Sequence, residues 1–152
     1  MSRDTRIAAF CIAGLALIIM TAAVSTTFAI AHGAPQFLRW PFKIMCHGIP
    51  HRCLTIFATP MPICARCVGI YSGLLAGLLL FPLFREANER VMKIVLAVVA
   101  VPMLIDGLTQ AFGLRESTNP LRLATGLTLG AAFGIWVLVS IETRARQRVA
   151  AS

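Results

Sequence analysis

The stretch CARCVGIYSGLLAGLLLFPLF, residues 64–84, combines the two features that decide this fold. It opens on a Cys-x-x-Cys motif, Cys64 to Cys67, and continues as an apolar run in which glycine recurs at every fourth position. With a few residues borrowed from the motif, the run approaches the roughly 20 residues that a helix needs to cross the hydrocarbon core of a bilayer. We therefore predict a membrane-spanning helix over about residues 66–84, with a pair of cysteines at its start.

Three further apolar runs predict spanning helices over about residues 7–31, 94–114 and 121–141. The chain of 152 residues is 58% hydrophobic and only 13% charged, which excludes a water-soluble enzyme. Because backbone groups in lipid must bond to each other, these segments should be helices. The sequence thus predicts one integral-membrane domain over 1–152, an all-α bundle of four transmembrane helices with a long Cys/His-containing first loop over about 33–65.

Glycine spacing predicts how two of these helices pack. Gly69, Gly73 and Gly77 share one face of the second helix, and the fourth helix carries a matching set at the same spacing, Gly126, Gly130 and Gly134. Small residues at a spacing of four let two helix backbones approach closely, which gains dispersion contacts that lipid does not offer. We expect the second and fourth helices to touch along these faces.

The net charge of +8 indicates membrane topology, because the basic residues lie mainly in short gaps between apolar runs; no nucleic-acid partner is expected. Lys and Arg are somewhat more numerous on the side of the two termini, which favours a multi-pass protein of the inner (cytoplasmic) membrane with both termini cytoplasmic and the Cys/His loop outward. The first apolar run is longer than the 7–15 residues or so of a signal peptide's apolar region, so we expect a retained helix. The bilayer is the predicted partner, and a homo-oligomer or a membrane complex is compatible with the sequence.

The first loop holds a cluster of potential metal ligands. A Cys-x-x-Cys step lets two thiolates bind one ion, and zinc completes its tetrahedron with two more sulfur or nitrogen donors. Thiolates with imidazole favour zinc, although copper(I) and iron also fit such ligands. Neighbouring side chains diverge, so adjacent residues do not easily bind one ion. The ligand set that we nevertheless predict is Cys46, His47, Cys64 and Cys67, with His51 and Cys53 as substitutes.

The same cysteines permit two other interpretations. Cys64 and Cys67 lie where a helix begins, and the helix dipole together with Arg66 stabilises thiolate. A Cys46–Cys53 pair beside a Cys64–Cys67 pair would then relay electrons to a quinone, as in a membrane thiol-disulfide oxidoreductase. Alternatively, the cysteines form structural disulfides in a non-catalytic membrane partner of a larger complex.

A polar group ends the third predicted helix. Asp106 and Gln110 are four residues apart and share a helix face, and a carboxylate inside an apolar segment is a functional candidate by default. Both are candidate catalytic residues, although an ion pair that only fixes helix packing is equally compatible. The segment lies on the same membrane side as the Cys/His loop, so one composite site is allowed. The polar cluster that we expect there comprises Arg52, Arg66, Arg115, Ser117, Asn119 and Arg122.

Together these motifs resemble a known family. They read Cys46-His47-x-x-Pro50-x-Arg52, Pro62-x-Cys64-Ala65-Arg66-Cys67-x-Gly69-x-Tyr71-x-Gly73, Asp106-Gly107-x-x-Gln110 and Arg115-x-Ser117-x-Asn119-x-x-Arg122. The pattern resembles the small prokaryotic membrane proteins grouped as domain of unknown function 2085. This resemblance implies a multi-helix membrane protein whose motif residues meet in one place, and it leaves the substrate and the reaction open. Cys53 stands where the resemblance leads us to expect serine, which argues against it as a principal ligand.

Overall fold

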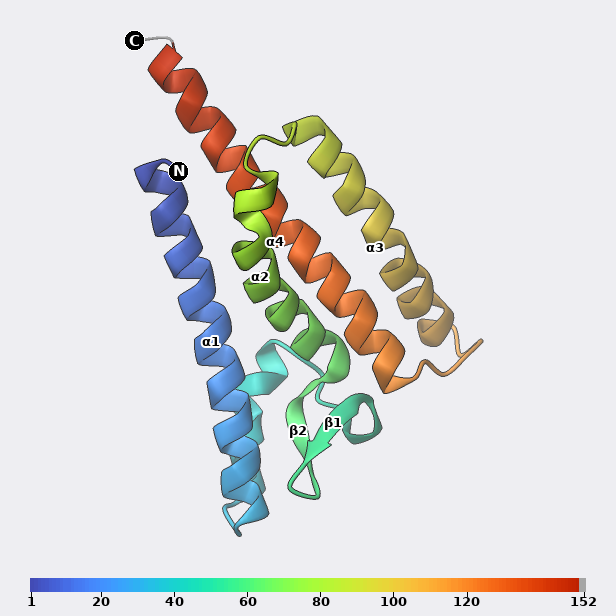
Figure 1. The fold of residues 1–152 in the computed structure, drawn as a ribbon. Coiled ribbons are helices and arrows are strands. Elements are labelled where there is room, and N and C mark those ends of the chain that lie inside the picture. The colour runs from blue at the N-terminus through green and yellow to red at the C-terminus, as the bar shows by residue number, and fades with distance from the viewer. Residues whose placement is uncertain (151–152) are drawn as a thin grey trace.

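The computed structural model describes residues 1–150, and over this range the chain forms four long helices. Each is long and apolar enough to cross a membrane. They are α1 (Arg3–Ala31), α2 (Ala65–Phe84), α3 (Glu89–Ala111) and α4 (Asn119–Ala150). The predicted all-α bundle with four candidate spans is therefore confirmed, and Figure 1 shows both chain termini at one end of it.

Helix α4 is the central element, because it packs on α2 and α3 and also contacts α1. Its contact with α2 runs along the two glycine faces, as the spacing predicted. A Cβ atom added at Gly73 would lie 2.9 Å from the backbone nitrogen of Ala131, and one added at Gly130 would lie 2.9 Å from the carbonyl carbon of Ile70. These distances leave no room for a side chain, so glycine sets how closely the two helices approach.

Lipid-facing surfaces account for the high apolar content. Large hydrophobic side chains are exposed along the outer faces of the helices, among them Phe10, Leu79 and Leu83. Such surfaces would be unfavourable in water, but they match the hydrocarbon core of a bilayer.

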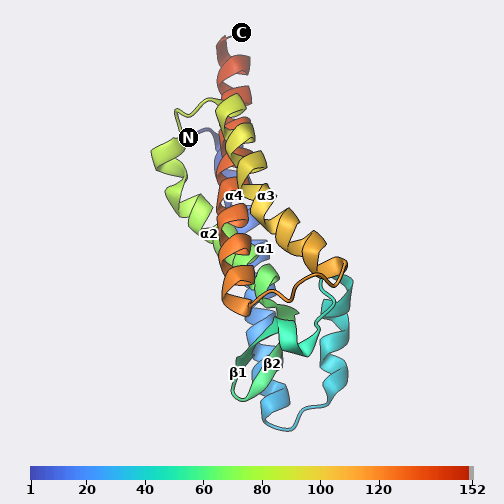
Figure 2. The same ribbon diagram turned by 90° about the vertical axis from the view of Figure 1, so that its right-hand side faces the viewer.

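The segment between α1 and α2 is more ordered than the predicted loop. It holds two 3₁₀ helices, η1 (Gln36–Ile44) and η2 (Pro50–Arg52), and an antiparallel hairpin of β1 (Cys53–Ile56) and β2 (Thr59–Cys64). Phe57 and Ala58 form the turn with positive φ angles of 53° and 55°, the backbone conformation that a tight hairpin with twisted strands requires. Both views place this hairpin at the end of the bundle opposite the termini (Figure 1 and Figure 2).

Burial of the hairpin explains why it is ordered. Met61 and Ile63 on β2 are each 1% exposed and pack with Ala23, Phe42 and Val68 in one apolar cluster. Strand β2 runs directly into α2, so the hairpin fixes the position of the first turn of that helix.

The bounds of the third and fourth predicted helices differ from the structure. The third helix, expected over 94–114, begins at Glu89 and ends at Ala111, because the chain turns through Gly113 with a φ of 68°. The fourth, expected over 121–141, begins at Asn119 and continues to Ala150. This continuation carries Glu142, which is 3% exposed and accepts hydrogen bonds from the Ser2 backbone and the Thr5 hydroxyl, both at 2.8 Å. The contact joins the start of α1 to α4.

Candidate metal centre

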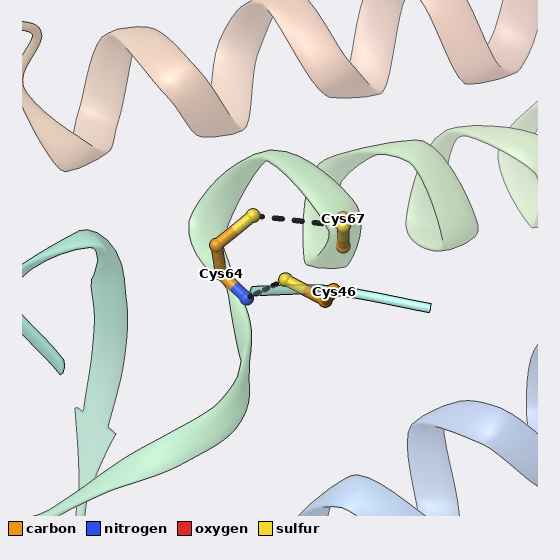
Figure 3. A group of neighbouring side chains, drawn as sticks. All are labelled: Cys46, Cys64 and Cys67. Atoms are coloured by element: carbon orange, nitrogen blue, oxygen red, sulfur yellow. Dashed lines mark hydrogen bonds between the residues drawn. The ribbon is translucent and has the colours of Figure 1, made fainter. Parts of the chain in front are cut away.

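Three of the four predicted metal ligands come together at the start of α2. Cys64 is the N-cap residue of the helix, Cys67 lies in its first turn, and Cys46 follows η1. Their sulfur atoms all lie within 4.8 Å of one another. Figure 3 shows the three side chains grouped at the first turn of α2. A turn at Gly48, with a φ of 57°, brings the chain back toward β2, and a Cβ there would lie 3.0 Å from the Pro62 carbonyl oxygen. This three-thiol group has the size of a metal site.

Hydrogen bonds favour the charged form of one thiol. The backbone N–H of Cys64 donates to the sulfur of Cys46 at 3.2 Å, and the sulfurs of Cys64 and Cys67 are 3.5 Å apart. Hydrogen bonds from the thiols of Cys64 and Cys67 lower the pKa of Cys46 to about 2, although its burial acts in the opposite direction. Thiolate is the form of cysteine that binds metals, so the geometry suits an ion.

The other predicted ligands lie outside this group. Among the His, Cys, Asp and Glu residues of the described chain, none places a ligand atom with the three sulfurs. His47 and His51 are exposed, and Cys53 is buried with its thiol donating to the Ile49 carbonyl at 3.2 Å. Burial raises the pKa of Cys53 to about 11, so this thiol stays neutral. Because side chains of adjacent residues diverge, the ring nitrogens of His47 do not lie with the three sulfurs although Cys46 does.

Arg66 connects the first turn of α2 to α3. It lies between the two cysteines of the Cys-x-x-Cys motif and forms an ion pair with the carboxylate of Asp106. Asp106 is 6% exposed, and Arg115 approaches its other oxygen at 3.9 Å. Asp106, a candidate catalytic residue in the sequence, is thus held in an ion pair between α2 and α3, which favours a positioning role for this carboxylate.

Arg122 organises the second part of the polar cluster. It is 3% exposed, and its guanidinium donates to Asn119 at 2.9 Å and to the side-chain oxygen of Gln110 at 2.5 Å. The same oxygen accepts from the backbone of Ser117 at 3.2 Å, and the Asn119 amide donates to the Cys53 carbonyl at 3.2 Å. These contacts join α3, α4 and the hairpin at one end of the bundle.

A cavity of about 330 Å³ opens beside the three thiols. Its polar wall carries side chains that the sequence analysis singled out, which are Cys46, His47, Arg52, Cys64, Arg66, Cys67, Gln110 and Arg122. Its apolar wall is formed by Met45, Ile49, Ile70 and Met103. Sequence reasoning missed this apolar wall, because a hydrophobic residue in or near a membrane span carries no signal that distinguishes a cavity from a lipid contact. Asp106 is paired with Arg66 but does not itself line the cavity.

These features define a multi-pass membrane protein with a thiol group and an arginine cluster at one end of a helical bundle. The comparisons with known proteins agree with this class. Residues 46–136 match a family model described as "Predicted membrane protein (DUF2085)", and the chain belongs to this family.

Two archaeal proteins are similar in sequence to this chain. An uncharacterized protein of Methanocaldococcus jannaschii is 38% identical over 99 residues, which cover 64% of each chain. An uncharacterized protein of Methanothermobacter thermautotrophicus is 35% identical over 100 residues, covering 66% of this chain and 88% of the relative. The match thus spans less than two thirds of the Methanocaldococcus protein. No solved structure matches the chain.

Proposed function

We propose that this membrane protein holds a zinc ion through Cys46, Cys64 and Cys67 and leaves its fourth coordination position open toward the cavity. The observation that carries the proposal is the approach of three sulfurs to within 4.8 Å, with no fourth His, Cys, Asp or Glu ligand atom beside them in residues 1–150. Structural zinc sites are closed by four protein ligands, whereas catalytic sites keep one position for water or substrate. A three-sulfur site beside a cavity corresponds to the second kind.

In this proposal the polar cluster shapes the cavity. Asp106 holds Arg66 in place, and Gln110 and Asn119 hold Arg122, so both arginines line the cavity beside the three thiols from fixed positions. A zinc ion with an open position polarises a bound oxygen or activates water. Of the two predicted catalytic residues, Gln110 lines the cavity and can reach a ligand there. The site faces outward from the inner membrane, with both termini in the cytoplasm.

Metal analysis tests the proposal. The protein is purified in a neutral detergent without chelators, and its zinc content is measured by mass spectrometry of the element. We expect about one zinc per chain by this ligand count, with loss in Cys46→Ser, Cys64→Ser and Cys67→Ser. Cys11→Ser is the matched control, because Cys11 lies exposed on α1, outside the three-thiol group. Purified protein that contains no zinc and takes up none would refute the proposal.

A membrane thiol-disulfide oxidoreductase is the second candidate. It is favoured by the 3.5 Å separation of the Cys64 and Cys67 sulfurs, which lies within reach of a disulfide bond. In that reaction the two thiols lose two electrons and two protons to a quinone and form an S–S bond. All five cysteines are free thiols in this structure. Alkylation of the purified protein with and without reductant distinguishes the candidates, because an oxidoreductase or a disulfide-stabilised partner protein would gain thiols on reduction.

A further inference from the structure

The cavity beside the three thiols holds more positive charge than its surroundings balance. Three guanidinium groups line it, those of Arg52, Arg66 and Arg122, and only Arg66 has a carboxylate partner. The guanidinium of Arg122 is bonded to neutral amide oxygens, and its Nε atom is buried without a hydrogen-bond partner. The side chain of Arg52 makes no hydrogen bond or ion pair with any residue from 1 to 150.

A bound metal would not remove this excess. Three thiolates and one divalent cation together carry a single negative charge, and Asp106 supplies another. The three arginines that line the cavity outnumber these two, and Arg115 beside Asp106 adds a fourth positive group. Burying an uncompensated charge is costly, so an anion that enters the cavity gains energy from these groups.

The walls of the cavity indicate the chemical class of that anion. A guanidinium group binds the oxygens of carboxylate or phosphate through two parallel hydrogen bonds. Met45, Ile49, Ile70 and Met103 line the same cavity and supply apolar surface beside these donors. The volume of about 330 Å³ has room for an oxyanion that carries a compact apolar body.

We propose that the cavity binds an organic oxyanion, with its carboxylate or phosphate against Arg52 and Arg122 and its apolar part against the methionine and isoleucine side chains. If an oxygen of the anion also occupies the open metal position, the organic oxyanion is the substrate class of the proposed metal site. Only that part of the inference rests on the proposed function. The anion enters either as the headgroup of an acidic lipid or as a small molecule from the aqueous side.

Isothermal titration calorimetry on the full-length protein in dodecyl maltoside tests this proposal. The probes are octyl phosphate, octanoate, inorganic phosphate and dioctanoyl phosphatidic acid, with uncharged octyl glucoside as the neutral probe. We expect saturable binding of octyl phosphate or octanoate and none of octyl glucoside. Binding confined to phosphatidic acid assigns the site to a lipid headgroup, whereas binding of the single-chain anions assigns it to a small molecule.

Arg52→Gln is the decisive variant, because Arg52 has no partner in the described protein whose loss would disturb the fold. We expect it to weaken anion binding about tenfold or more, since hydrogen bonds to charged groups are the strong ones. Arg90→Gln is the matched control, because Arg90 is exposed at the far end of α3. No anion binding in the unmodified protein, or equal binding in Arg52→Gln and Arg90→Gln, would overturn the inference.

Zinc content measured on the same samples separates this inference from the metal proposal. Anion binding that depends on Arg52, in protein that contains no zinc and takes up none, would support the anion site and refute the metal centre. Protein that contains zinc but binds none of the probes would refute the anion site alone.

Discussion

Replacing Gly73 by alanine tests the packing that positions the site. The added Cβ would lie 2.9 Å from both the Ala131 nitrogen and the carbonyl carbon of Leu127, and both atoms belong to the rigid backbone of α4. Helices α2 and α4 must therefore move apart, and overpacking of this kind costs about 1–3 kcal/mol. Alanine also removes the roughly 1 kcal/mol disadvantage of glycine inside a helix. A net loss of up to about 2 kcal/mol in unfolding free energy follows from these two values.

Gly14→Ala is the matched control for this substitution. Gly14 lies inside α1, and a Cβ there has no atom within 4 Å outside its own helix backbone, so only the favourable change in helix propensity remains. Unfolding by sodium dodecyl sulfate in mixed micelles, followed by circular dichroism, measures both variants. We expect Gly14→Ala to unfold at the same or higher denaturant fraction and Gly73→Ala at a lower one. Equal shifts for the two variants would refute the close α2–α4 contact as the source of stability.

The remaining predictions concern the charged and thiol groups. Asp106→Asn should lower the unfolding free energy by about 3 kcal/mol, because it leaves Arg66 without its buried partner. In the same unfolding assay the control Glu86→Gln, which removes an exposed ion pair, should have little effect. Equal losses in the two variants would refute a structural role for the Arg66–Asp106 pair. Burial raises the pKa of Cys53 from 9.0 to about 11, so the unfolded protein loses this proton at lower pH than the folded protein. The unfolding free energy should therefore be constant below pH 9 as far as Cys53 is concerned and should decline between pH 9 and about 11. Cys53→Ala should reduce that decline. An identical pH profile in the variant would refute the assignment of the decline to the Cys53 thiol.

The helical scaffold was predictable because its signals are local. Four apolar runs fix the spans, and glycine at a spacing of four fixes which helix faces meet, since a side chain there would collide with the partner backbone. The end of α4 was missed because residues after 141 are polar, and their helix is supported by a tertiary contact of Glu142 with the start of α1. The hairpin was missed because Pro60 and Pro62 argue against a strand in the sequence.

The site was predictable in its residue types more than in its geometry. The Cys-x-x-Cys step and Cys46 do meet, but no ligand atom of His47 joins the three sulfurs, and no spacing rule states which of two adjacent side chains faces an ion. The cluster around Asp106 follows from the order of the four helices, because α2 begins and α3 ends at the same end of the bundle. The isolation of Arg52 depends on which groups surround it in space, and a sequence contains no signal for a missing partner.

X-ray absorption at the zinc edge of the purified, metal-loaded protein tests the central claim most directly, because it counts the atoms bound to the ion. The three-thiol site predicts three sulfur neighbours at about 2.3 Å and one oxygen or nitrogen neighbour at about 2.0 Å, without the scattering pattern of an imidazole ring. The Cys46→Ser variant, which we expect to lose its zinc, should give no three-sulfur signal. A shell of four sulfurs, a histidine in the fourth position, or no sulfur at all would contradict the open three-thiol centre.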